Sequence, residues 1–362
     1  MQMENKLYTL IGLLIFCQLS SCGSLTGKKS KSKKGSSIEF KSFREYCTER
    51  DSEPSLKHTV KLLLEYVQAG ADCELANDKL SNETSLTFIA ESISDVRPFA
   101  SLNNLTSLNL LNNLISDPSP LSKLENLTRL QLEKNKITDV SSLKSLTQLE
   151  YLNIKKNQIA DFSDLNELTE LKELYIAENH VKNLGDLNNL NKLETLDLSS
   201  NHLKSIEGLS GLDELKVLLL SNTWMKDYQA LKDLPKLVSL DLNNGHIFDI
   251  GFISDFKSLQ ILKIANNHIS NISALEELVN LKECFLNHNF IEDISVLSKI
   301  EGLQVLNLRS NTINSVNPIS NLTQLSSLNM ENNPLGDRMR KDESNCLVSE
   351  ESSAVYRTFC TQ

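Results

Sequence analysis

The segments LTRLQLEKNKI (127–137), LEYLNIKKNQI (149–159) and LETLDLSSNHL (193–203) decide the fold of this 362-residue chain. Each has an LxL pair, or LxI in the second segment, with an asparagine three residues after the second member of the pair. That column recurs every 22 residues and gives twelve turns, at Glu91, Asn113, Asn135, Asn157, Asn179, Asn201, Thr223, Gly245, Asn267, Asn289, Asn311 and Asn333. A fixed period of this length predicts a solenoid, in which each repeat packs against its neighbours.

The alternation within each LxL pair predicts a short strand with one buried face, so Leu130 and Leu132 are expected to point inward. Strands of successive turns stack at about 4.8 Å and predict a long parallel sheet. In the second half of each repeat, leucines at every third residue, as from Leu143 to Leu149, predict a short 3₁₀-like segment.

The column asparagines are interpreted as structural, because an amide both donates to and accepts from backbone groups that are otherwise buried without partners. The aspartate that precedes each 3₁₀-like segment is interpreted as an N-cap. These aspartates are Asp117, Asp139, Asp161, Asp227, Asp249 and Asp293. The chain lacks the dense glycine–aspartate pattern of calcium-binding solenoids, so no metal site is expected.

The pattern resembles the bacterial 22-residue leucine-rich repeat of the internalin type, and it covers about 250 of the 362 residues. The resemblance implies an α/β solenoid: a curved right-handed array with a parallel concave sheet, a short 3₁₀ or irregular convex side, and a concave face that recognises other proteins. The expected domains are a lipoprotein signal peptide (1–21), a tether (22–38), an N-terminal cap (39–85), the repeats (86–335) and a C-terminal cap (336–362).

The N-terminus is typical of an exported protein. The apolar run 7–19 is too short to span a membrane comfortably and fits a signal peptide. It ends in LSSC (19–22), which resembles the bacterial lipobox and by that resemblance makes Cys22 the lipid-carrying first residue. An ordinary secretory signal cut nearby is the alternative. Because Gly23 and Ser24 replace the aspartate of inner-membrane lipoproteins, the outer membrane is the expected location.

Five lysines between residues 28 and 34 make the tether basic, whereas the whole chain has a net charge of −10. The tether suits an anionic membrane surface, or serves equally well as a solvated spacer. The acidic folded part disfavours nucleic acid as a partner. In the N-terminal cap, apolar residues spaced from Leu56 to Val67 predict an amphipathic helix that stops near Gly70.

The chain has seven cysteines, and their positions favour an oxidising compartment. Cys17 is expected to leave with the signal peptide, Cys22 to carry the lipid, and Cys284 to occupy an inward leucine position. The remaining four predict two disulfides, Cys47–Cys73 in the N-terminal cap and Cys346–Cys360 in the C-terminal cap.

Large residues at outward strand positions are the candidate partner-binding residues, because exposed apolar groups mark interfaces. They are Tyr151, Tyr175, Val217, Leu219, Ile261, Phe285 and Val305. Thr223 and Gly245 break the asparagine column, and Trp224 is the only tryptophan in the chain, so a binding centre is expected around Leu219 and Trp224. Scattered surface residues and drift in a tolerant array are the alternatives.

A row of aromatic residues follows the column directly: His180, His202, Trp224, His246, His268 and Phe290. We interpret it as a polar edge, because no cysteine or carboxylate in the row completes a zinc site.

The sequence as a whole predicts a lipid-anchored recognition protein, a monomer with a protein partner, without a cofactor. An envelope scaffold, or a cytosolic scaffold similar to phosphatase regulators, is the alternative. No catalytic arrangement is present in the sequence, so an enzyme is not expected.

Overall fold

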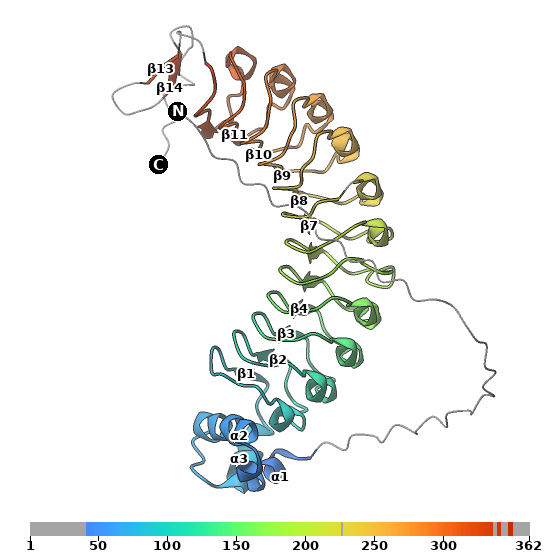
Figure 1. Cartoon of the computed structure of the whole chain (residues 1–362), viewed down its shortest axis with the longest axis vertical. Coiled ribbons are helices and arrows are strands. Elements are labelled where there is room, and N and C mark those ends of the chain that lie inside the picture. Colours follow the sequence, from blue (N-terminus) through green and yellow to red (C-terminus); the bar gives the residue numbers. More distant parts are fainter. Residues whose placement is uncertain (1–40, 226, 336–338, 342–346, 350–362) are drawn as a thin grey trace, which may run out of the picture. The chain divides into compact units, whose positions relative to one another are not determined.

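A computed structural model describes residues 41–225 and 227–335, together with the backbone of 339–341 and 347–349. Between residues 85 and 329 twelve strands form one parallel sheet in chain order, and Figure 1 shows them along the inner side of the stacked turns. The strands are β1 (Ser85–Thr87), β2 (Ser107–Asn109), β3 (Arg129–Gln131), β4 (Tyr151–Asn153), β5 (Glu173–Tyr175), β6 (Thr195–Asp197), β7 (Val217–Leu219), β8 (Ser239–Asp241), β9 (Ile261–Lys263), β10 (Glu283–Phe285), β11 (Val305–Asn307) and β12 (Ser327–Asn329). The predicted solenoid is confirmed.

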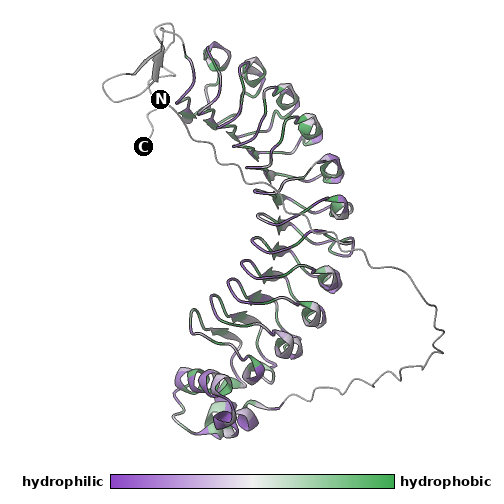
Figure 2. Cartoon of the chain, viewed as in Figure 1, coloured by the Kyte–Doolittle hydropathy of each residue, from purple (hydrophilic) through white to green (hydrophobic). Residues whose placement is uncertain are grey.

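The register of the sheet follows the period of the sequence, since each strand residue pairs with the residue 22 positions further on, as Leu152 does with Leu174. The middle residue of every strand is buried, including Cys284 in β10. In Figure 2 hydrophobic and hydrophilic residues alternate along each turn, as expected of a core shared between neighbouring turns.

The opposite side of the stack is made of short 3₁₀ segments, as the leucine spacing predicts. In the repeats they are η2 (Arg97–Phe99), η3 (Ser119–Lys123), η4 (Ser141–Ser145), η5 (Ser163–Glu167), η6 (Glu207–Leu209), η7 (Gln229–Asp233), η8 (Gly251–Asp255), η9 (Ser273–Glu277), η10 (Ser295–Lys299) and η11 (Asn317–Ile319). Each predicted capping aspartate accepts the first N–H of its segment: Asp139 Oδ1 lies 2.8 Å from the Ser141 nitrogen. The aspartates stand one residue before the expected N-cap position, which Val140 holds in this turn.

One turn departs from this plan. Among the described residues, the segment between β5 and β6 contains no 3₁₀ helix. Gly185 lies where the neighbouring turns begin theirs, and its φ of 69° is incompatible with helical geometry. In the next turn Gly208 approaches so closely that a Cβ at this position would lie 2.1 Å from the Gly185 carbonyl oxygen. Glycine at 208 is therefore required by contact between two backbones.

The asparagine column works as predicted. The side chain of Asn157 accepts a hydrogen bond from the Ile137 N–H at 3.0 Å, in the preceding turn. Its amide nitrogen donates to the carbonyls of Leu132 in the preceding turn and Ile154 in its own turn, each at 3.0 Å. The same set of bonds recurs at Asn135, and at the other asparagines of the column from 113 to 333. Each amide therefore fastens one turn to the one before it.

The N-terminal cap consists of α1 (Phe43–Thr48), η1 (Arg50–Ser52), α2 (Pro54–Tyr66) and α3 (Cys73–Leu80). Helix α2 is the predicted amphipathic helix, but it ends before the expected stop, because Gln68 already adopts a left-handed φ of 51°. Thr59 donates to the Asp95 carbonyl at 2.8 Å, and a ring nitrogen of His58 lies 2.6 Å from the Glu91 carbonyl. These bonds join the cap to the first turn.

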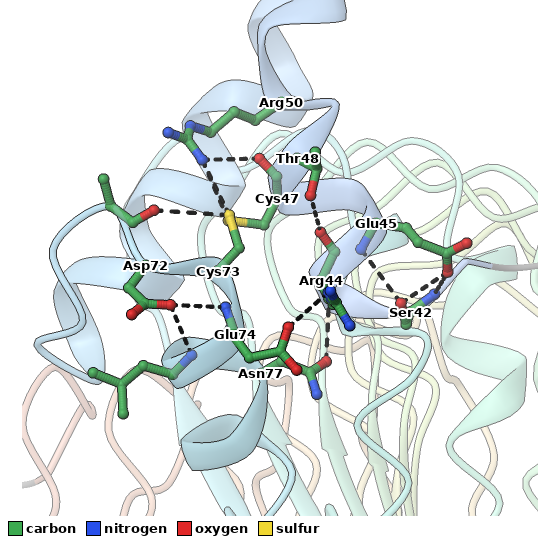
Figure 3. Close-up of a disulfide and its surroundings, with 12 residues drawn as sticks. Ser42, Arg44, Glu45, Cys47, Thr48, Arg50, Asp72, Cys73, Glu74 and Asn77 are labelled. Atoms are coloured by element: carbon green, nitrogen blue, oxygen red, sulfur yellow. Dashed lines mark hydrogen bonds and ion pairs between the residues drawn. A yellow bond between two sulfur atoms is a disulfide. The ribbon is translucent and has the colours of Figure 1, made fainter.

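The disulfide predicted for the N-terminal cap is present between Cys47 and Cys73, and it links α1 to α3 (Figure 3). Arg50 donates from its guanidinium to the Cys47 carbonyl at 2.9 Å, beside this bond. The predicted Cys346–Cys360 pair lies outside the described residues.

At the other end of the chain, β13 (Met339–Lys341) and β14 (Leu347–Ser349) form an antiparallel pair. The predicted signal peptide, Cys22 and the tether lie outside the described residues. None of the helices in the described part of the chain is long and apolar enough to cross a membrane.

We predict that Asn157→Ala destabilises the fold by about 2–5 kcal/mol, since it leaves buried backbone groups of two turns without partners. Asn126→Ala is the matched control: its exposed amide also bonds the preceding turn, at 2.7 Å to Asn103, but water replaces that bond. The control should lose less than about 1 kcal/mol. Equal losses in chemical denaturation of the two variants would contradict a structural role specific to the column.

Candidate functional site

The first and third residues of each strand form the face of the sheet opposite the core, which we call the concave face. Among the predicted partner-binding residues, those on strands all lie on this face and are partly exposed. They are Tyr151, Tyr175, Val217, Leu219, Ile261, Phe285 and Val305. The structure divides them into a tyrosine group and an apolar group.

The tyrosine group contains Tyr151 and Tyr175, whose ring centroids lie 5.6 Å apart. The guanidinium of Arg129 lies over the Tyr151 ring at 4.0 Å, within the range of a cation–π interaction. The Tyr175 hydroxyl donates to the Glu173 carboxylate at 2.7 Å. Burial raises the pKa of Tyr175, and this hydrogen bond raises it further, so the hydroxyl remains a donor at neutral pH.

The apolar group extends over β7 to β11. Val217, Ile261 and Val305 belong to one row of strand partners, with one strand between consecutive members, so these side chains are two strand spacings, about 10 Å, apart. Leu219 and Phe285 belong to the parallel row, which also contains Lys263 and an aspartate. The group therefore combines several apolar side chains with charged residues that lie between them in the same rows.

An ion pair with a buried carboxylate separates the two groups. Lys155 donates to Asp197 of β6 at 2.8 Å, and only 3% of the Asp197 side chain is exposed. Burial alone lowers the pKa of Lys155, but the hydrogen bond to Asp197 and its negative charge outweigh it and hold that pKa above its ordinary value. The pair spans two turns and fixes this part of the concave face.

Trp224 does not join the concave groups, contrary to the expected binding centre with Leu219. It lies in the loop after β7, with 72% of its surface exposed, and lines a hollow of about 770 Å³. No residue lining this hollow belongs to a strand. We call it the flank hollow; among its lining residues are Ser200, His202, Lys204, Asn222, Trp224 and His246.

The aromatic row on this edge is in close contact. The rings of His180 and His202 are stacked at 6.0 Å, and the ring of Trp224 meets that of His246 edge-on at 4.7 Å. His246 and His268 approach to 3.2 Å between ring nitrogens. The described residues contain no group of three or more His, Cys, Asp or Glu side chains arranged to hold a metal ion.

The bend has other partners where the asparagines are missing at 223 and 245. The Thr223 hydroxyl donates to the Leu220 carbonyl of its own turn. The hydroxyl of Tyr228 lies 3.4 Å from the Thr223 carbonyl and 3.3 Å from the Gly245 carbonyl, which are not the carbonyls that a column amide bonds. A Cβ at Gly245 would lie 3.1 Å from this hydroxyl and equally close to the Ile247 side chain. Both side chains therefore crowd the space next to Gly245.

Sequence reasoning missed Tyr228. Its ring is buried and stacks on Phe252 at 5.3 Å. Burial raises the pKa of Tyr228 to about 12, so its hydroxyl remains a donor. The signal was present: other repeats place Val140, Ile250 or Ile272 at this position, and tyrosine is the polar exception next to the two broken column positions.

The parallel sheet, the asparagine column and the row of 3₁₀ segments define a leucine-rich-repeat protein, a fold typical of domains that recognise proteins. A family model described as leucine-rich repeats (2 copies) matches residues 125–167 and 169–211. An internalin (inlF) from Listeria monocytogenes str. 4b F2365 has a similar structure, with 32% sequence identity, a TM-score of 0.71, and coverage of 76% of this chain and 82% of that chain. The chain belongs to the internalin-type leucine-rich-repeat family.

More distant structures share the fold. The leucine-rich-repeat protein LIC12759 of Leptospira interrogans is 19% identical, with a TM-score of 0.58 over 72% of this chain and 87% of that one. A TDR receptor is 21% identical, with a TM-score of 0.60 over 71% of this chain and 48% of that one. No curated protein sequence matches the chain significantly.

The contact between Tyr228 and Gly245 predicts a non-additive pair of substitutions. Gly245→Asn alone should destabilise the fold by about 1–3 kcal/mol through overpacking against Tyr228 and Ile247. In the double variant Tyr228→Ile/Gly245→Asn the contact with the hydroxyl is removed, only that with Ile247 remains, and a column amide is restored. The double variant should therefore be more stable than the sum of the single effects by about 1 kcal/mol or more, measured by denaturation of all four proteins. Additive losses would contradict a coupling between Tyr228 and position 245.

Proposed function

We propose that this protein binds a protein partner through the concave face, with the apolar group on β7, β9, β10 and β11 as the centre of the interface. The observation that carries the proposal is the position of Val217, Leu219, Ile261 and Phe285 on one face of the sheet, partly exposed among polar residues. Removing such side chains from water favours association by roughly 25 cal/mol per Å² of apolar surface.

The tyrosine group supplies a second part of the same surface. Tyrosine and arginine are enriched at the energetic centres of protein interfaces, because they combine a large contact area with hydrogen bonding. Tyr151 and Arg129 already stack on each other, so little side-chain freedom remains to be lost on binding. A partner that covers both groups spans the Lys155–Asp197 pair between them.

The membrane anchor is part of the proposal and is supported by the sequence alone. The short apolar run followed by LSSC (19–22) favours export, cleavage before Cys22 and lipid attachment to that cysteine. The Cys47–Cys73 disulfide agrees with an oxidising compartment outside the cytosol. We propose an envelope protein held by its lipid, in the outer membrane where the host has two.

The test of the concave face is a photo-crosslinking amino acid placed at Leu219 in the native cell. The matched control carries the same group at Lys232, an exposed position of η7 on the opposite side of the stack. We expect a discrete protein adduct from position 219 only. Smears, polymer adducts or equal labelling from both positions would favour a scaffold role and contradict the proposal.

With the partner identified, Leu219→Ala and Phe285→Ala should each weaken binding about tenfold or more, as hot-spot truncations do. Lys232→Ala should leave the affinity unchanged. Circular dichroism melting of the three variants verifies that their folds are intact.

The anchor has a separate prediction. The mature protein should begin at Cys22 and carry the added mass of its acyl chains, as measured by intact mass and N-terminal peptide analysis. Cys22→Ala should leave the signal peptide uncleaved by the lipoprotein pathway and remove the acyl mass. An unmodified mature N-terminus at residue 22, or a later free one, would contradict lipidation.

A further inference from the structure

The flank hollow is separate from the concave face and contains the only tryptophan of the chain. Large aromatic side chains are rarely left open to water without a role in binding. Trp224 is nevertheless 72% exposed, and Phe248 and Phe290 on the same edge are 69% and 57% exposed. The volume of about 770 Å³ lies in the range of small-ligand sites.

A series of backbone hydrogen bonds between successive turns is interrupted around the hollow. On this edge the N–H of each row residue normally donates to the carbonyl 21 residues earlier: His202 bonds Val181 and His268 bonds Ile247, each at 2.8 Å. In the described part of the chain, Trp224 and His246 do not continue this ladder. The backbone of His246 is also left-handed, with φ 54°. Two backbone donors therefore lie within the lining of the hollow without an acceptor among the described residues.

The polar lining is rich in uncharged groups. Ser200 and Asn222 are joined at 3.2 Å, and the amide side chains of Asn244 and Asn266 lie beside them without a hydrogen-bond partner among the described residues. Among the described residues of the lining, Lys204 is the only one with a formal charge and none is a carboxylate. Cationic ligands therefore lack a counter-charge in this part of the chain, and the net charge of −10 disfavours polyanions.

We propose that the flank hollow binds an uncharged oligosaccharide built of pyranose units. A pyranose ring has a face of C–H groups that packs flat on an indole, and hydroxyls around its rim that both donate and accept hydrogen bonds. Trp224 supplies the first contact; Asn244, Asn266 and the two open backbone donors supply the second. Successive rings of the aromatic row, at about the strand spacing, extend the stacking surface to neighbouring units.

The experiment uses the intrinsic fluorescence of Trp224, which reports on this site alone because the chain has no other tryptophan. The full folded protein is titrated with cellotetraose, maltotetraose and chitotetraose to about 10 mM, beyond the millimolar affinities that a few such contacts give. We expect a saturable blue shift with at least one of these neutral oligosaccharides, since stacking removes water from the indole.

Two variants separate binding from folding. Asn244→Ala keeps the fluorophore and should weaken the response about tenfold, equivalent to about 1.4 kcal/mol. Leu219→Ala, on the concave face, should leave the response unchanged, so this site and the proposed partner surface succeed or fail independently. Calorimetric titration of Trp224→Ala with the active sugar should show weakened binding.

Three outcomes would overturn the proposal. One is the absence of a saturable response to all three sugars by the folded protein. Another is a response that Asn244→Ala does not alter. The third is a saturable response to an oligothymidylate in place of the sugars, which would assign the hollow to nucleobase stacking.

Discussion

The structure depends on the hydrogen bonds of a buried primary amide. At each regular turn the asparagine carries out three tasks at once: it accepts one N–H and donates to one carbonyl of the preceding turn, and it donates to a carbonyl of its own turn. Those backbone groups lie in a bend enclosed by leucines, where water does not reach them. Leaving one of them unpaired costs about 1–3 kcal/mol, comparable to the stabilisation that a repeat contributes. The 22-residue period of the sequence is therefore the spacing of the asparagines that make these hydrogen bonds.

A backbone feature accompanies the column. The residue before each column position adopts a left-handed φ near 55°, although it is Lys156 in one turn and Glu178 in the next. That conformation costs roughly 1–2 kcal/mol for a residue other than glycine. It also precedes Thr223 and Gly245, so it belongs to the bend of every turn and does not depend on the amide. Where the column lacks asparagine, another group serves the bend: the N-terminal cap reaches the Glu91 carbonyl through His58, and Tyr228 reaches the carbonyls of Thr223 and Gly245.

The fold was predictable from the sequence because each of its rules is local and repeated. Strand positions, buried leucines and column amides follow from the spacing of the residues. Because the repeat occurs twelve times, a few irregular turns do not obscure the pattern. The missed features depend on a single side chain in three dimensions. Tyr228 is five residues from Thr223 and 17 from Gly245, and only folding shows that its hydroxyl lies between them. Gln68 ends α2 before the glycine because its own backbone turns left-handed.

The candidate site shows the same limit. The strand residues of the concave face were identified correctly as outward-facing, since alternation determines it, and their binding role stays a prediction. Leu219 and Trp224 are close in sequence and were expected to act together. The chain turns between them through the left-handed Asn222, so one belongs to the sheet and the other to the loop edge. A sequence pattern does not show how far such a bend separates two neighbours.

The exceptions in the column and the flank hollow lie in the same turns. On either side of them the amides of Asn201 and Asn267 bond the turn that precedes each. At Thr223 and Gly245 the hydroxyl of Tyr228 lies on the core side of the bend, 3.4 and 3.3 Å from their carbonyls. Among the described residues, the backbone ladder of the loop edge is interrupted at Trp224 and His246, which line the flank hollow. The loss of two column amides and the interruption of this ladder therefore coincide at one place in the solenoid, and a change in either alters the surface that these two turns expose.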